Sequence, residues 1–251
     1  MHSVKLFFNS QNSMEGKKQE GSRPSFKQKV LRFFKWVLIL FFGSTILVTI
    51  IYRFVNPPAT PLMLMRVVEQ LADGDQPKLQ KDWVPIEAIS LNMKLAVIAS
   101  EDNHFESHYG VDLKAIEKAS KLNQKGRKIR GASTISQQTA KNVFLWPARN
   151  WVRKGFELYF TGLIEIFWGK KRIMEVYLNV IEMGNGIYGV EEAAQTYFHK
   201  HASQLSRSEA AALAAVLPNP IRWRPDKPTP YLQKTIGRIE WAMNNVERPE
   251  W

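Results

Sequence analysis

Polar residues of the kinds that transfer protons and bind anions gather in one stretch of this chain, from Glu101 to Asn142. The stretch opens on Glu101-Asp102 directly after an apolar run, and it closes at 133–142 on small hydroxyl residues, amides and a lysine. Because a buried polar group without a partner is costly, such a run is poor core material. We therefore expect these side chains to face a cleft, where a substrate can bind them.

Two carboxylates are the candidate acid–base groups. Glu101 and Glu157 both lie beside apolar segments that predict helices, and Arg153 and Lys154 shortly precede Glu157. A partly buried glutamate has a raised pKa, which suits a general acid or base near neutral pH.

Three cations in the same part of the chain are candidates for binding phosphate. Arg149 and Arg153 offer a planar fork of donors, whereas Lys141 offers a point charge. On the residues alone, ordinary surface ion pairs explain these charges equally well.

Several other chemistries are disfavoured by the motifs. Gly184–Gly189 matches a dinucleotide-binding glycine pattern, but a predicted helix precedes it instead of a strand, so we expect a tight turn between two helices. No serine is followed three residues later by lysine and no Lys-Thr-Gly occurs, which argues against a serine acyl-enzyme. His104 and His108 could share a helix face, but no third metal ligand is evident and we predict no metal site.

The elements that must position these residues are mainly helical. Helical spacing of apolar residues predicts helices at 62–80 (in part), 87–100, 111–122, 133–145, 151–168, 170–183, 190–198 and 206–217. Ser206 and Glu209 form a capping-box pattern at the start of the last helix. No alternating strand pattern of any length follows residue 87, and Glu101 falls at the end of a buried helix.

The N-terminal part predicts a membrane anchor. The formal net charge is +12, and about half of this excess lies in the first 35 residues. From Trp36 to Tyr52 the chain holds 17 uncharged, mostly apolar residues, enough with their apolar neighbours to span the bilayer core of roughly 30 Å. A cleaved signal peptide is the alternative, but no Ala-x-Ala site follows.

The expected organisation has four parts: a cytoplasmic basic tail at 1–32, a transmembrane helix at 33–55, a linker and membrane-proximal segment at 56–80, and a domain at 81–251. The basic residues before the span place the N-terminus in the cytoplasm and the domain outside it. Nucleic-acid binding is disfavoured because the basic excess lies beside the span. A further basic run at 125–130 is either a solvated loop or a contact with anionic groups.

Five sequence blocks in order resemble the peptidoglycan glycosyltransferases of family 51, in their monofunctional membrane-anchored form, over about residues 80–220. The blocks are Glu101-Asp102-x-x-Phe105-x-x-His108-x-Gly110; Gly131-x-Ser133-Thr134-Ile135-x-Gln137-Gln138-x-x-Lys141-Asn142; Arg153-Lys154-x-x-Glu157; Lys171 to Asn179 with Gly184-x-Gly186-x-x-Gly189; and Ser208-Glu209-Ala210-Ala211-x-Leu213-Ala214 with Pro218-x-Pro220. The resemblance implies a mainly helical, lysozyme-like domain in two lobes with a cleft between them.

It also implies a reaction, the polymerisation of lipid II into glycan strands with inversion at the anomeric carbon and release of undecaprenyl pyrophosphate, without transpeptidase activity. By the resemblance, Glu101 is the general base and Glu157 is the second carboxylate on the acceptor side. Lys141 and Arg149 match positions that bind the pyrophosphate. The implied cleft lining is Ser133, Gln137, Gln138, Arg153 and Lys154.

The implied partners are lipid II, the lipid-linked glycan strand and, through one transmembrane helix, the bacterial inner membrane, with other cell-wall synthases as candidates. The implied catalytic side is periplasmic, and a divalent cation such as Mg or Mn is a candidate helper for the pyrophosphate. The rival hypotheses are a lytic transglycosylase and a non-catalytic, membrane-tethered cell-wall scaffold.

Overall fold

A computed structural model of the chain describes residues 25–124, 133–148 and 150–251. The basic run at 125–130, Arg149 and most of the predicted cytoplasmic tail lie outside the described residues. Helix α1 (Phe26–Phe54) contains nearly all of the predicted span and is long and apolar enough to cross a membrane. The chain divides into residues 1–44 and a compact unit of residues 45–251, so the last residues of α1 belong to the compact unit.

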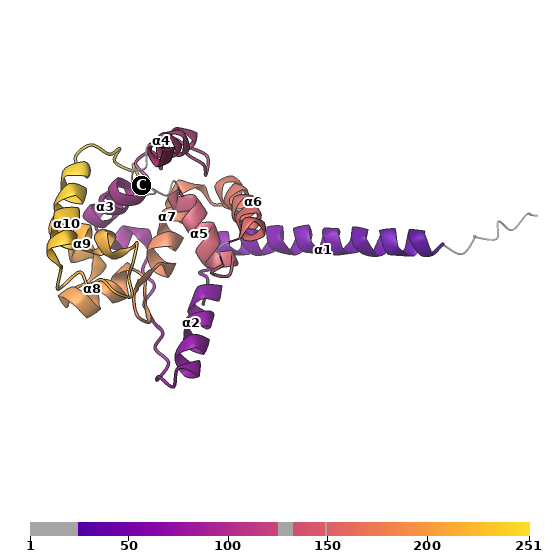
Figure 1. The fold of residues 1–251 in the computed structure, drawn as a ribbon, viewed down its shortest axis with the longest axis horizontal. Coiled ribbons are helices and arrows are strands. Elements are labelled where there is room, and N and C mark those ends of the chain that lie inside the picture. The colour runs from indigo at the N-terminus through magenta and orange to yellow at the C-terminus, as the bar shows by residue number, and fades with distance from the viewer. Residues whose placement is uncertain (1–24, 125–132, 149) are drawn as a thin grey trace, which may run out of the picture. The chain divides into compact units, whose positions relative to one another are not determined.

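The compact unit is built mainly from helices (Figure 1). They are α2 (Pro61–Ala72), α3 (Leu91–Glu101), α4 (Leu113–Gln124), α5 (Ile135–Phe144), α6 (Trp151–Phe167), α7 (Gly169–Val180), α8 (Val190–Phe198), α9 (Arg207–Val216) and α10 (Pro230–Ala242), with short 3-10 turns at Ile86–Ala88 and Ala202–Gln204. The predicted helices are confirmed to within a few residues at their ends. The capping box of Ser206 and Glu209 is also confirmed.

A small sheet departs from the prediction. Strands β1 (Gln80–Lys81), β2 (Glu182–Gly184) and β3 (Ile187–Tyr188) form a sheet in the order β1-β3-β2, with β1 parallel and β2 antiparallel to β3. We had expected the glycine-rich segment to turn between two helices. It turns between two strands instead. Gly186 has a φ of 70°, and a Cβ there would collide with the carbonyl oxygen of Lys78, so this turn requires glycine.

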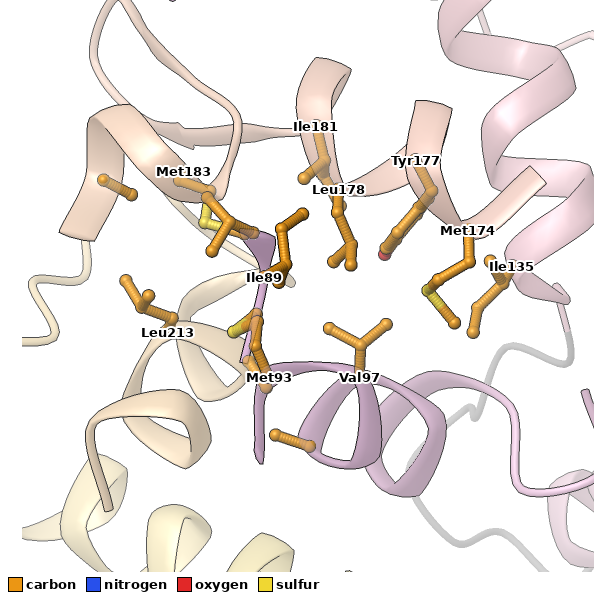
Figure 2. Close-up of a cluster of buried hydrophobic side chains, with 14 of the residues drawn as sticks. Ile89, Met93, Val97, Ile135, Met174, Tyr177, Leu178, Ile181, Met183 and Leu213 are labelled. Atoms are coloured by element: carbon orange, nitrogen blue, oxygen red, sulfur yellow. The ribbon is translucent and has the colours of Figure 1, made fainter. Parts of the chain in front are cut away.

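Helix α3 lies at the centre of the core, which explains why its apolar residues do not keep to one face. Val97 and Met93 face α7 and α9 across the cluster shown in Figure 2, where they meet Tyr177, Leu178 and Leu213. All five side chains are buried. A helix surrounded in this way has little freedom to shift, which fixes the position of its last residue.

The end of α1 is part of this folded unit. The indole N–H of Trp168 donates to the backbone oxygen of buried Thr49 at 2.7 Å, and the Arg172 guanidinium donates to the backbone oxygen of Tyr52 at 3.0 Å. Both donors come from the α6–α7 region. The last two to three turns of the apolar helix are thus hydrogen-bonded to the domain, although the predicted domain boundaries at 32, 55 and 80 remain predictions.

Candidate active site

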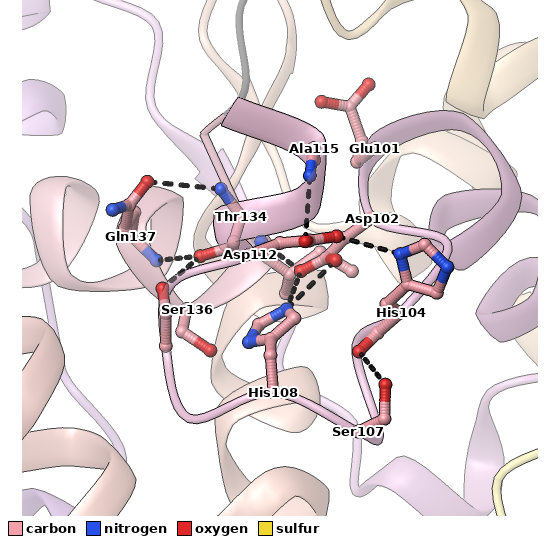
Figure 3. Close-up of polar contacts among 12 residues, drawn as sticks. Glu101, Asp102, His104, Ser107, His108, Asp112, Ala115, Thr134, Ser136 and Gln137 are labelled. Carbon is pink, nitrogen blue, oxygen red and sulfur yellow. Dashed lines mark hydrogen bonds and ion pairs between the residues drawn. The ribbon is translucent and has the colours of Figure 1, made fainter. Parts of the chain in front are cut away.

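Glu101 is the last residue of α3, as expected. Ser90 caps the start of the helix, where its hydroxyl accepts a hydrogen bond from the backbone N–H of Met93. The helix ends because Asp102, with a φ of −160° and a ψ of 79°, leaves the helical conformation. The side chain of Glu101 points away from the polar cluster that begins at Asp102 (Figure 3). The carboxylate therefore stands at the rim of the core on a rigid support.

One amide holds the Glu101 carboxylate. Gln138 Nε2 donates to Glu101 Oε2 at 2.8 Å, and the buried Tyr177 hydroxyl donates to Gln138 Oε1 at 3.0 Å. Because the hydroxyl occupies the amide oxygen, the amide nitrogen is turned toward the carboxylate. Sequence reasoning gave Tyr177 no role in the site, since nothing local marks a tyrosine 39 residues from its partner.

Burial raises the pKa of Glu101 above the ordinary value of a glutamate. The hydrogen bond from Gln138 and the charge of Lys141 oppose this shift, whereas the charge of neighbouring Asp102 adds to it. Desolvation is the largest of these effects. A carboxylate whose proton affinity has been raised in this way is a stronger base than one in water.

Asp102 connects the end of α3 to the start of α5. Its Oδ2 accepts the backbone N–H of Ile135 at 3.0 Å and lies 2.9 Å from His108 Nε2 (Figure 3). Next to it, Thr134 Oγ1 donates to the backbone oxygen of Gly110 at 2.7 Å. These bonds fix the N-terminus of α5, the helix that carries Gln138, relative to Glu101.

The histidines do not converge on a common point. His108 pairs with Asp102, while His104 Nδ1 lies 2.8 Å from Asp112 Oδ2. Within the described ranges, no three His, Asp or Glu side chains form a group suited to a metal ion.

The second carboxylate has very different surroundings. Glu157 on α6 is 3% exposed and accepts hydrogen bonds from Arg153 Nη1 at 2.5 Å and from Lys154 Nζ. Asn150 caps the helix by accepting the backbone N–H of Arg153 at 2.7 Å. One turn of α6 thus presents a carboxylate held between two cations.

Lys141 on α5 lies in the field of both carboxylates. Burial lowers the pKa of Lys141, the negative charges of Glu157 and Glu101 raise it, and the positive charges of Arg153 and Lys154 lower it. The predicted cation site is therefore brought together around Lys141, Arg153 and Lys154. Arg149, the remaining predicted phosphate ligand, lies outside the described residues.

A cavity of about 690 Å³ opens beside Glu101. The C-terminal end of α3 lines it together with α4, α9, α10 and the segment at Ser133–Thr134. Ser133 was predicted to line the cleft, and the structure places it on the cavity wall. The three cations Lys141, Arg153 and Lys154 do not line this cavity.

Gln137 occupies a different position from the one predicted. It is 3% exposed, and its amide oxygen accepts the backbone N–H of Thr134 at 3.2 Å, which completes a capping box at the start of α5. The structure does not bring Gln137 to the cavity. A threonine at a helix start followed three positions later by a glutamine is the capping-box pattern, so the capping role of Gln137 could have been predicted from the sequence.

A helical domain with a desolvated glutamate beside a cavity has the features of an enzyme that uses a carboxylate for general acid–base catalysis. The family model described as Transglycosylase matches residues 67–247, so the chain belongs to this family of enzymes. Relatives called biosynthetic peptidoglycan transglycosylase are 55% identical in Bacteroides thetaiotaomicron, over 90% of this chain and 91% of the relative, and 51% identical in Bdellovibrio bacteriovorus, over 84% and 85%. Another, from Pseudomonas entomophila, is 48% identical over 88% and 94%.

Proposed function

We propose that this protein polymerises lipid II, a disaccharide-peptide carried on undecaprenyl pyrophosphate, into glycan strands of peptidoglycan. The observation that carries the proposal is the placement of Glu101, which is desolvated, held by one amide and open to a cavity. Family membership and the names of the relatives support the substrate.

In this reaction Glu101 acts as the general base. Its carboxylate takes the proton of the acceptor sugar's 4-hydroxyl while the oxygen attacks the anomeric carbon of the donor from the face opposite the leaving group. A new C–O bond forms, the bond to the pyrophosphate oxygen breaks, and the configuration inverts. The raised pKa of Glu101 favours the proton transfer.

The cations act on the leaving group. Negative charge develops on the pyrophosphate as its bond breaks, and fixed positive groups stabilise that charge. Lys141 and Arg149 are the residues we assign to it. Glu157 keeps Arg153 and Lys154 in position beside Lys141, because both hydrogen bonds to its carboxylate come from these cations. The assignment of Glu157 to the acceptor side rests on the resemblance.

A lipid-linked substrate requires a site at the membrane surface, and α1 supports such a placement. Its last turns fold with the domain, and Thr45 Oγ1 lies 2.7 Å from the Tyr159 hydroxyl of α6. Thr45 is about 13 Å along the helix from Phe54. If α1 spans the bilayer, α6 therefore lies beside the apolar portion of α1, deeper in the membrane than Phe54.

The surface of α6 agrees with contact to lipid. Trp151 is 91% exposed and Ile166 is 74% exposed, and Val152 and Leu158 are also exposed. We assign this face to the outer leaflet of the cytoplasmic membrane. The basic residues before α1 favour a cytoplasmic N-terminus and an external catalytic unit.

The test is polymerisation of labelled lipid II by the full chain in detergent, with Glu101→Gln in parallel. We expect long strands from the wild type and a loss of about a hundred- to ten-thousandfold in rate from the variant. Folding of the variant is checked by its melting temperature. A folded wild type that makes no polymer would contradict the proposal, and cleavage of preformed strands would identify a lytic transglycosylase instead.

A further inference from the structure

The cavity beside Glu101 is lined by three carboxylates and three cations, and the two sets differ in the partners that they have among the described residues. Each of its carboxylates already has a partner among the described residues. Glu101 accepts from Gln138, Asp102 is bound to His108, and Asp112 accepts the backbone N–H of Ala115 at 2.9 Å besides pairing with His104.

The cations on the same walls have no carboxylate partner among the described residues. Lys114 and Lys118 lie one turn apart on α4, and Arg238 lies on α10. All three side chains are exposed, and none of them makes an ion pair with the part of the chain that the structure describes. Arg238 Nη2 donates to Thr235 Oγ1, at 2.9 Å and one turn away on its own helix.

The three cations are separate from the group assigned to the pyrophosphate. Lys141, Arg153 and Lys154 come from α5 and α6 and do not line the cavity, whereas α4 and α10 supply Lys114, Lys118 and Arg238. Glu101 contributes to the cavity wall and also lies in the field of Lys141. A substrate unit in the cavity would thus reach the base along walls that the leaving group's cations do not line.

The positions of the three cations indicate which kind of anion would bind in the cavity. They stand on two different helices that border one cavity, whose lining also includes small or apolar residues such as Ala215, Pro218 and Ile239. Charges spread along two walls suit several carboxylates on an extended chain better than they suit one compact diphosphate. An arginine fork also matches a carboxylate in geometry.

We propose that Lys114, Lys118 and Arg238 bind the free carboxylates of the peptide carried by the acceptor sugar unit, and so select acceptors with an acidic peptide. The inference rests on the proposed function, because the peptide belongs to lipid II. It assigns to α4 and α10 a role in substrate selection that is independent of the proton transfer at Glu101. A cavity of about 690 Å³ is within the usual range of roughly 300–1,000 Å³ for sites that hold ligands of this size.

The experiment measures KM and kcat of the full chain in detergent with two substrates, native lipid II and lipid II whose peptide carboxylates have been amidated. Arg238→Gln and Lys118→Gln should each raise KM for the native substrate about three- to tenfold, with kcat changed less than about twofold. With the amidated substrate these variants should match the wild type. Lys234→Gln is the matched control, since Lys234 is an exposed lysine of α10 outside the cavity lining.

Equal increases in KM with both substrates would overturn the inference and assign the cations to a diphosphate, and no increase would overturn it as well. A second measurement does not depend on polymerisation. Calorimetry with a soluble muramoyl peptide should show binding to the wild type and to Lys234→Gln, and weaker binding to Arg238→Gln. If the wild type binds this peptide but makes no polymer, the proposed function fails while the peptide site stands.

Discussion

The two glutamates of the site are both largely removed from water, yet their surroundings differ. Glu157 lies between Arg153 and Lys154, which bind both of its oxygens. Glu101 has one neutral donor, Gln138, and burial raises its pKa. The comparison shows how one fold separates two tasks: a carboxylate bound to cations organises charge, whereas one bound to a neutral amide keeps its affinity for a proton.

The comparison is tested most strongly by Glu157→Gln set against Glu101→Gln. Removing the charge of Glu157 leaves Arg153 and Lys154 facing each other without their carboxylate, so we expect the free energy of unfolding to fall by about 3 kcal/mol and the polymerisation rate to fall as well.

Glu101→Gln should leave the free energy of unfolding unchanged or higher at pH 7. A raised pKa means that the folded state disfavours the charged form, so a neutral amide relieves this cost above the ordinary pKa of glutamate. Urea denaturation of both variants measures the difference. Equal destabilisation by the two substitutions would show that the carboxylates do not differ as described.

A pH profile of kcat/KM sharpens the comparison on the side of Glu101. Activity requires the carboxylate form, so it should fall as the pH drops through the raised pKa of Glu101. This fall should occur at a higher pH than an ordinary glutamate would give. Gln138→Leu removes a hydrogen bond that lowers this pKa, and the acidic limb should then move to higher pH. The alkaline limb, to which the lowered pKa of Lys141 contributes, should stay in place. An acidic limb that does not move would exclude Glu101 as the group that titrates.

Tyr177→Phe is expected to have the smallest effect. It removes the hydroxyl that orients Gln138 but keeps the buried ring, so kcat should fall about two- to fivefold and stability by about 1 kcal/mol. The same polymerisation assay measures the change in kcat. No change in kcat together with a loss of stability would show that the hydroxyl serves only the core.

The positions of the helices and the location of Glu101 could be predicted from the sequence, because helical periodicity and caps are local signals. The small sheet could not, since strands of two or three residues carry no alternation and β1 pairs with β3 across more than 100 residues. Helix α10 was missed although its signals are local: Thr229 caps it, Pro230 opens it, and Leu232 and Ile236 follow at helical spacing.

The site shows the same division. The motifs predicted which polar residues belong together, but they did not distinguish Gln138, which binds Glu101, from Gln137, which caps α5. Neighbouring residues of one helix face different ways, and only the packing of α5 against its neighbours decides which amide meets the carboxylate. The contribution of Tyr177 depends in the same way on a contact between two helices.

The hydrogen bonds from Trp168 and Arg172 to the end of α1 have a consequence for how this protein can be divided. A protease cut at the apparent membrane boundary would not release an intact soluble enzyme. It would remove part of the folded unit, leave two donors without their acceptors and expose aromatic surface around Phe144, on which Tyr52 stacks. We therefore expect shedding of the catalytic unit to inactivate it, because the last turns of α1 are part of the folded unit.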